Sequence, residues 1–333
     1  MPLAKEFLRA MKAPILSWLD SDDKDDWYLA ADNLPICNNL FLELHTNSNE
    51  SRCDIITSLA YSDGTLSEFL NKHNATTSPV WCRTVDFLEN WHEQLKGKDG
   101  FLKKYIFSVW LEFDLRPEFY NSMDPSIFIA LTPFANIDEL TKDLKEYPDF
   151  QTSLQNSLPF LKGLKKDDPI ILGHIGYMAP RQNKKQSLFL RSCWRCNSVS
   201  HFLELLNESR IVFNYDILCN QIKWMYEIEG DINSYLLDLD SNETGYSSEF
   251  CLELNVYNSL SPHKENLLLR KMEELGFVSS KQKQSFKKFS GNYILNSKKP
   301  FNSTLHHIKL KFIDSQIAEI KCYWRVSLKP RLW

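Results

Sequence analysis

Two strand-like segments near the end of the sequence carry basic residues at alternate positions. Apolar residues fill the intervening positions over 305–313 and 317–328. Successive side chains of a strand point to opposite faces, so the polar residues share one face. That face contains His307, Lys309, Lys311, Lys321, Tyr323, Arg325 and Ser327. Such a face could bind an anion, pair with acidic side chains, or lie in solvent on an open sheet, the commonest outcome for a terminal hairpin.

The same alternation selects carboxylates and aromatic residues in earlier segments. Over 105–115 the odd positions are almost all apolar or aromatic, and the even positions are Ile106, Ser108, Trp110, Glu112 and Asp114. The corresponding sets elsewhere are Phe41, Glu43 and His45; Arg191; and Cys251, Glu253, Asn255 and Tyr257. Carboxylates on this face could take protons from a ligand or neutralise the cations, and for Glu43 and Glu112 both roles remain open.

These segments belong to a repeated pattern of two strands followed by helical sequence. A leading helix is expected at about 3–19, and strand pairs at about 40–61, 105–132, 170–195, 234–257 and 305–328. Asn136, followed by two acidic residues in the first turn, predicts the start of one helix. The units recur roughly every 60 residues without a flexible linker, which predicts a single barrel domain over 1–333.

Ten antiparallel strands can remove their unpaired edges by closing into a barrel. The expected fold is therefore α+β, a ten-stranded antiparallel β-barrel of five strand-pair and helix repeats, with the helices outside. The apolar face of each strand would pack on the helices, and the polar face would line a lumen. Buried cations there would each cost several kcal/mol unless an anion or acidic side chains compensated them.

Composition excludes several classes of function. The 333 residues carry a formal charge of −4, which disfavours nucleic acid as a partner. The sequence has only 10 glycines and contains neither GxGxxG nor GxxxxGK[ST], so glycine-built nucleotide cradles are excluded. No apolar run is long enough to span a membrane. Eight scattered cysteines and a start without a signal peptide predict unpaired thiols and a cytoplasmic location.

The order of elements resembles that of the ABBA-fold (PT-barrel) aromatic and peptide prenyltransferases over roughly residues 40–328. The resemblance lies in architecture and in the Lys-x-Tyr alternation of Lys321 and Tyr323, with Lys309 and Lys311 on the partner strand. It implies transfer of an isoprenyl group from an allylic diphosphate to an aromatic small molecule or a peptide side chain, in secondary metabolism. Several strands lack the basic-x-Tyr pair usual in that family, and acids are more numerous than a diphosphate site needs.

The resemblance assigns roles to residues of the predicted lumen. Positive charge stabilises a departing diphosphate, and π faces stabilise the carbocation left behind. Glu43 is the first candidate for the base that takes the proton of the acceptor, and Glu112 is the second. No cofactor is obligatory, although Mg²⁺ could accompany the diphosphate. The proposed diphosphate contacts are Arg191, Lys309, Lys321 and Arg325, and the proposed cation shield is Trp110, Tyr257 and Tyr323.

Alternatives to this chemistry remain. A non-prenylating barrel could bind an anionic or peptide ligand in a biosynthetic pathway. Asp22–Asp26 satisfies DDxxD, but the long-helix context of that metal motif is missing, so a solvated cap between helices is the better interpretation. His306 and His307 are adjacent in a strand and should point to opposite faces, so no metal site is predicted.

Overall fold

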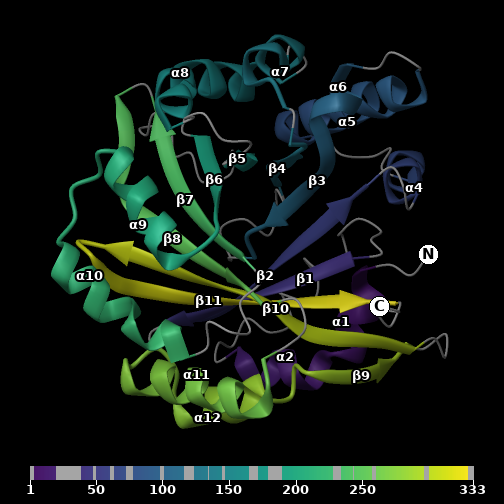
Figure 1. Ribbon diagram of the computed structural model, residues 1–333. Helices are drawn as coiled ribbons and strands as arrows, with labels where there is room; N and C mark the ends of the chain where they lie inside the picture. Colours follow the sequence, from purple (N-terminus) through teal and green to yellow (C-terminus); the bar gives the residue numbers. More distant parts are fainter. Residues whose placement is uncertain are drawn as a thin grey trace.

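Ten antiparallel strands form a closed barrel (Figure 1). The computed structural model describes residues 4–19, 39–47, 50–60, 64–72, 78–97, 101–115, 124–133, 135–144, 147–164, 172–178, 190–227, 234–242, 244–256, 260–295 and 300–328. The barrel strands are β1 (Asn39–Asn47), β2 (Glu50–Leu59), β3 (Ile106–Phe113), β4 (Ser126–Leu131), β5 (Leu172–Tyr177), β6 (Leu190–Cys196), β7 (Ser234–Asn242), β8 (Gly245–Asn255), β10 (Pro300–Ile313) and β11 (Gln316–Ser327). Neighbours in the chain pair from β1 to β8, β8 pairs with β10, and β11 closes the ring by pairing with both β10 and β1.

Helices surround the barrel, as the repeat pattern predicts (Figure 1). They follow each of the first four strand pairs, and within the described residues 4–19 two short helices precede the first pair. The helices are α1 (Ala4–Ala10), α2 (Lys12–Trp18), α4 (Thr65–Lys72), α5 (Pro79–Lys96), α6 (Phe101–Tyr105), α7 (Ile137–Asp143), α8 (Pro148–Leu164), α9 (Val199–Glu208), α10 (Tyr215–Ile222), α11 (Pro262–Glu274) and α12 (Ser280–Phe286), with the 3-10 helix η3 (Lys223–Glu227).

The ten-stranded barrel with outer helices is confirmed, and the structure adds details that alternation does not reveal. A short strand, β9 (Gly291–Ile294), pairs with the first residues of β10 outside the ring. The leading helix is divided at Met11 into α1 and α2. The Asn136 side chain caps α7 by accepting hydrogen bonds from the backbone N–H groups of Asp138 and Glu139, which confirms that predicted helix start.

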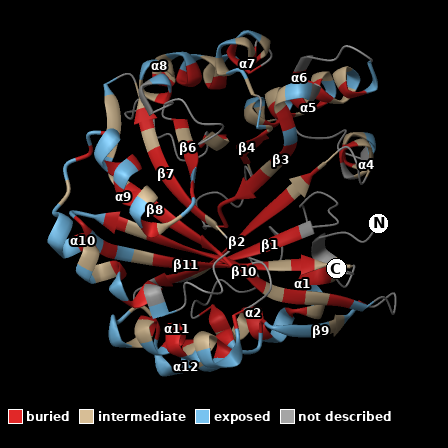
Figure 2. Cartoon of the chain, in the orientation of Figure 1, coloured by how far each residue is buried: buried red, intermediate tan, exposed pale blue. Residues whose placement is uncertain are grey.

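The main hydrophobic core lies between the barrel and its helices. Alternate strand residues, for example Leu40, Leu42 and Leu44 of β1, are fully buried together with apolar residues of the helices. Figure 2 shows buried residues along nearly every strand and on the barrel-facing sides of the helices. This outer core satisfies the apolar face of the sheet, so the opposite face of each strand is left to line the lumen.

Two β-bulges change which residues face inward. A register shift between Ile106 and Ser108 places Ile106 in the outer core, so its predicted lumen position was wrong, and neighbouring Phe107 is 73% exposed. A second shift, between Leu305 and His307, brings His306 and His307 to one face, where their rings lie 5.1 and 6.5 Å from that of Phe41. The prediction that these histidines point to opposite faces was therefore wrong, because a bulge adds a residue to one strand.

Gly176 on β5 allows the Phe128 ring of β4 to lie across the strand. A Cβ at Gly176 would lie 2.4 Å from two atoms of that ring. Gly176→Ala should therefore lower the free energy of unfolding by about 1–3 kcal/mol, as overpacking does. Urea denaturation measures the effect. Phe128→Leu should relieve most of it in the double variant, and a Gly176→Ala variant as stable as the wild type would contradict the prediction.

The described cysteines are free thiols. Five of the seven are buried, including Cys193 and Cys196, and Cys82 is exposed on α5. Burial raises the pKa of the Cys193 and Cys322 thiols, which disfavours their thiolates. Among the described residues, no helix is both long and apolar enough to cross a membrane.

Candidate functional site

Part of the inner face of the barrel is an aromatic surface, separate from the outer core. Phe41, Ile56 and Tyr323 are buried together, and Trp110 packs against them. Trp110 stacks on Phe41 with 5.0 Å between ring centroids, and His307 stacks on Tyr323 at 3.8 Å. Burial lowers the pKa of His307 to about 3, so this imidazole is neutral. We call Phe41, Trp110, His307 and Tyr323 the aromatic wall.

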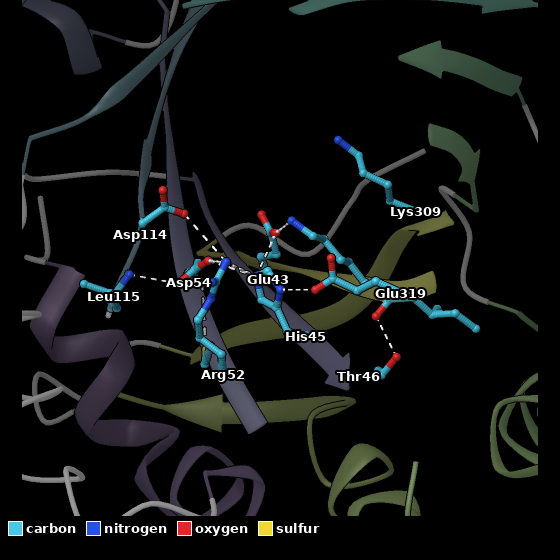
Figure 3. Close-up of polar contacts among 12 residues, drawn as sticks. Glu43, His45, Thr46, Arg52, Asp54, Asp114, Leu115, Lys309 and Glu319 are labelled. Atoms are coloured by element: carbon cyan, nitrogen blue, oxygen red, sulfur yellow. Dashed lines mark hydrogen bonds and ion pairs between the residues drawn. The ribbon is translucent and has the colours of Figure 1, made fainter. Parts of the chain in front are cut away.

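A buried ionic network, shown in Figure 3, lies next to the aromatic wall on β1 and β11. Glu43 follows Phe41 by two residues on β1, and its cross-strand neighbours are Asp54 on β2 and Tyr323 on β11. Its side chain is fully buried, and Oε1 lies 2.6 Å from Nζ of Lys321. We call Glu43, His45, Arg52, Asp54, Glu319 and Lys321 the Glu43 network.

His45 links three carboxylates within this network. Its Nε2 lies 2.8 Å from Asp54 Oδ2 and 3.0 Å from Glu43 Oε1, and its Nδ1 lies 2.5 Å from Glu319 Oε1. Burial and Lys321 act to lower the pKa of His45, but the charges of Asp54 and Glu43 outweigh them and raise it to about 9. The ring is therefore an imidazolium at neutral pH.

Arg52 and Asp54 complete the network on β2. Arg52 Nη2 lies 2.5 Å from Asp54 Oδ2 and 3.7 Å from Asp114 Oδ1. The other Asp54 oxygen, Oδ1, accepts a 2.8 Å hydrogen bond from the backbone N–H of Leu115. Donor atoms of Glu43, His45 and Asp54 lie within 4.8 Å of one another, which is close enough to surround a cation. Lys321 and Arg52 also lie within ion-pair distance of Glu43 and Asp54, so each of these two carboxylates belongs to an ion pair.

A second ionic group lies on β6, β7, β8 and β10, with Lys309, Asp238 and Glu253 buried and Arg191 and Asp240 partly buried. Lys309 Nζ lies 2.7 Å from Asp238 Oδ2 and 2.6 Å from Glu253 Oε1. Burial and the neighbouring charge of Glu253 raise the pKa of Asp238 to about 6 despite Lys309. Arg191 donates two hydrogen bonds to Asp240, from Nε to Oδ1 at 2.7 Å and from Nη2 to Oδ2 at 2.8 Å. Thus two predicted diphosphate contacts, Arg191 and Lys309, already pair with carboxylates.

The structure brings most of the predicted site residues to the lumen. Glu112 is buried on β3, between Ile56 on β2 and Ser126 on β4. Arg325 is half-buried on β11, with Phe41 and Thr304 as its cross-strand neighbours. Tyr257 and the Asp22–Asp26 segment lie outside the described residues. The functional roles assigned to these residues stay predictions.

Five charged residues of these ionic groups were not predicted from the sequence. All of them lie on the inner face of strands that already supply other residues, so the same alternation could have found them. On β2, Arg52 and Asp54 alternate with Cys53 and Ile55, which belong to the outer core. The remaining three are Asp238 and Asp240 on β7 and Glu319 on β11.

The fold of the chain matches solved structures of prenyltransferases. PriB in its apo form aligns over 98% of this chain and 97% of its own, with 11% identity and a TM-score of 0.59. A 5-dimethylallyltryptophan synthase from Streptomyces coelicolor aligns over 96% and 95%, with 10% identity and a TM-score of 0.55. AnaPT from Neosartorya fischeri aligns over 86% and 77%, with 9% identity and a TM-score of 0.53. The chain has the ABBA fold.

This ABBA barrel has no match among protein-family models or curated protein sequences. Solved complexes place a tryptophan and a diphosphate-bearing donor on one ABBA protein: PriB has been solved with L-tryptophan and dimethylallyl thiolodiphosphate, and also with product diphosphate. Identities near 10% carry the fold alone, so the chemistry of this ABBA barrel must be argued from its own lumen.

Proposed function

We propose that the protein is a prenyltransferase that moves an isoprenyl group from an allylic diphosphate to an aromatic or peptide side-chain acceptor in the lumen. The observation that carries the proposal is the position of the aromatic wall directly beside a buried carboxylate. Phe41 and Glu43 lie two residues apart on one face of β1, and Tyr323 is the cross-strand neighbour of Glu43. The neighbours in fold, which are prenyltransferases, support the same activity.

The proposed reaction uses both features. As the allylic C–O bond breaks, its electron pair leaves with the diphosphate, and the π faces of the aromatic wall stabilise the positive charge on the prenyl carbon. The acceptor ring then forms the new C–C bond. Its arenium intermediate loses a proton to Glu43, and the electron pair of the broken C–H bond restores aromaticity. The closed barrel keeps water from the cation.

The departing diphosphate requires positive charge. The lumen contains cations that could supply it, and most of them form ion pairs with carboxylates. Lys321 and Arg325 on β11 flank Tyr323, and Lys309 Nζ lies 5.6 Å from the centroid of the Tyr323 ring, so all three cations lie beside the aromatic wall. Lys309, Arg191 and Lys321 are held by carboxylates, and a diphosphate would have to replace those carboxylates or arrive with Mg²⁺. The acidic partners keep these cations stable in the lumen until a ligand enters.

The same ion pairs favour a second candidate function. Lys309 lies between two carboxylates and Arg191 donates to both oxygens of a third, so among the described residues these two cations are already paired before an anion enters. A non-prenylating barrel that binds a peptide or another ligand of a biosynthetic pathway would suit such a surface. Turnover distinguishes the two functions.

The decisive experiment incubates the purified chain with dimethylallyl or geranyl diphosphate and with tryptophan, tyrosine or peptide acceptors. Mass spectrometry should detect the gain of one prenyl group, with and without Mg²⁺. Calorimetry with the same diphosphates measures binding separately. Binding of a peptide without any transfer, across the whole donor and acceptor panel, would favour the second function.

Removal of a π face from the aromatic wall should slow transfer. Trp110→Leu is expected to reduce the rate by about 2- to 30-fold, which corresponds to the loss of one cation–π contact. Trp110→Phe keeps a ring at the same position and should lose less. Initial rates at saturating donor test the prediction. Equal rates for the leucine and phenylalanine variants would show that the π face of residue 110 does not stabilise the cation.

A further inference from the structure

His45 is enclosed by carboxylates that face both of its ring nitrogens. Asp54 and Glu43 lie at Nε2, and Glu319, from the other neighbouring strand, lies 2.5 Å from Nδ1. A neutral imidazole has only one N–H, so one lone pair would then face a carboxylate oxygen at close range. Both carboxylate contacts are favourable only when both nitrogens donate. Arg52 Nη2 also lies 2.8 Å from Nε2 and would donate to the lone pair of a neutral ring, so the three carboxylates favour the imidazolium and the Arg52 cation opposes it.

The charges of the Glu43 network lead to the same conclusion. Three carboxylates, Glu43, Asp54 and Glu319, face two permanent cations, Arg52 and Lys321. A proton on His45 makes this group neutral, and Asp114, 3.7 Å from Arg52, adds further negative charge. Because a buried net charge is costly, the fold favours the protonated ring. In turn, the hydrogen bond to His45 helps to lower the pKa of Glu319 to about 2, against the effect of its burial.

Both cations beside Glu43 contact the same oxygen. Lys321 Nζ lies 2.6 Å and His45 Nε2 lies 3.0 Å from Oε1, and the two residues are cross-strand neighbours on β11 and β1. Two donors that converge on one oxygen fix the torsion of the carboxylate. Glu319 is 21% exposed at its side chain, so this end of the network senses bulk solvent.

We infer that His45 and Glu319 are positioning residues for Glu43: the His45 imidazolium, held by Glu319, keeps the Glu43 carboxylate correctly oriented. The inference rests on the proposed role of Glu43 as the base. It predicts that the rate of prenyl transfer falls at alkaline pH, at the pH where His45 loses its proton. Above that pH the ring loses its proton, the charge balance of the network fails, and Glu43 loses one of its two donors.

The titration of His45 tests the inference without any substrate. With ¹⁵N-histidine labelling, the wild-type ring should lose its proton near pH 9, whereas His174 and His307, whose burial lowers their pKa values to about 4 and 3, should remain neutral from pH 6 upward. Glu319→Gln removes the charge at Nδ1 and should lower the His45 midpoint by about one to three pH units. Glu319→Asp keeps the charge, so its His45 midpoint should lie close to that of the wild type. Glu93→Gln, on the exposed surface of α5, should leave the His45 midpoint unchanged.

Two further measurements test the effect on Glu43. The rate of prenyl transfer in Glu319→Gln should fall at a lower pH than in the wild type, by the same shift as the His45 midpoint, with KM unchanged. A crystal structure of this variant above its midpoint should show Glu43 Oε1 moved away from His45. A wild-type ring that titrates near 6.5, an unshifted midpoint in Glu319→Gln, or an unmoved Glu43 would each overturn the inference. If the wild type transfers no prenyl group, the proposed function fails, while the NMR titration and the crystal structure still decide the inference.

Discussion

Glu43→Gln should reduce prenyl transfer by about 10²- to 10⁴-fold, the usual contribution of a general base. Glutamine can still accept a hydrogen bond from Lys321. We therefore expect the variant to remain folded although its transfer rate falls. Single-turnover rates with dimethylallyl diphosphate and the best acceptor measure the effect, and thermal melting verifies that the variant is folded at the assay temperature.

Glu112→Gln is the matched control for that variant. Glu112 is also buried on the inner face, two residues from Trp110 on β3, but its cross-strand neighbours are Ile56 and Ser126, whereas Glu43 is the cross-strand neighbour of Tyr323. Its replacement should slow transfer by less than tenfold, because the acceptor proton is assigned to Glu43. If Glu112→Gln instead causes the larger loss, the roles of the two carboxylates are exchanged. If neither variant loses rate, proton removal by a carboxylate is not part of the reaction.

The barrel was predictable because its signal is periodic and repeated. Alternation of apolar and polar residues fixes the two faces of a strand, so Lys321 and Tyr323 could be placed opposite the outer-core residues Cys322 and Trp324. With five repeats of the same unit, closure into a barrel is the arrangement that leaves no strand edge unpaired. Alternation fails at bulges, where one added residue inverts it, and this is why Ile106 and His306 were misplaced.

The ionic partners were harder to predict than the cations. Alternation places Lys309 and Arg191 inward, but it does not show which strand lies opposite or where a register shift lies. The pairing of Lys309 with Asp238 and Glu253 depends on β10 joining β8, and that depends on ring closure. His45 shows the same limit, since its contacts with Asp54 and Glu319 need the register of β1 against both β2 and β11.

The pairing of Lys309 also determines how much of the fold depends on charges inside the barrel. Lys309, Asp238 and Glu253 are all at least nine-tenths buried, so removal of the cation leaves two carboxylates that water cannot easily solvate. On β10 two residues away, Lys311 forms an ion pair of similar length with Glu249, 2.6 Å, but its side chain is 31% exposed and that of Glu249 is 45% exposed. The two lysines therefore form ion pairs of the same length, one buried and one partly exposed to solvent.

Lys309→Met should lower the free energy of unfolding by about 3–5 kcal/mol at pH 7.5, the usual effect of stranding a buried charge. Lys311→Met should lower it by no more than about 1 kcal/mol, because solvent screens the exposed pair. The loss in Lys309→Met should shrink on acidification. Burial already raises the pKa of Asp238 from 3.8 to about 6, and loss of Lys309 raises it further. A raised carboxyl pKa stabilises the fold at low pH and loses that contribution as the pH rises through the folded value.

Urea denaturation of both variants at pH 7.5 and 4.5 measures the two effects, and Lys309→Met with Asp238→Asn should regain part of the stability at pH 7.5. Equal losses for the two lysine variants, or a loss in Lys309→Met that does not change with pH, would mean that the lumen is wet enough to solvate its carboxylates. A wet lumen would also expose the proposed prenyl cation to capture by water. The same measurement therefore tests whether this barrel can protect a carbocation at all.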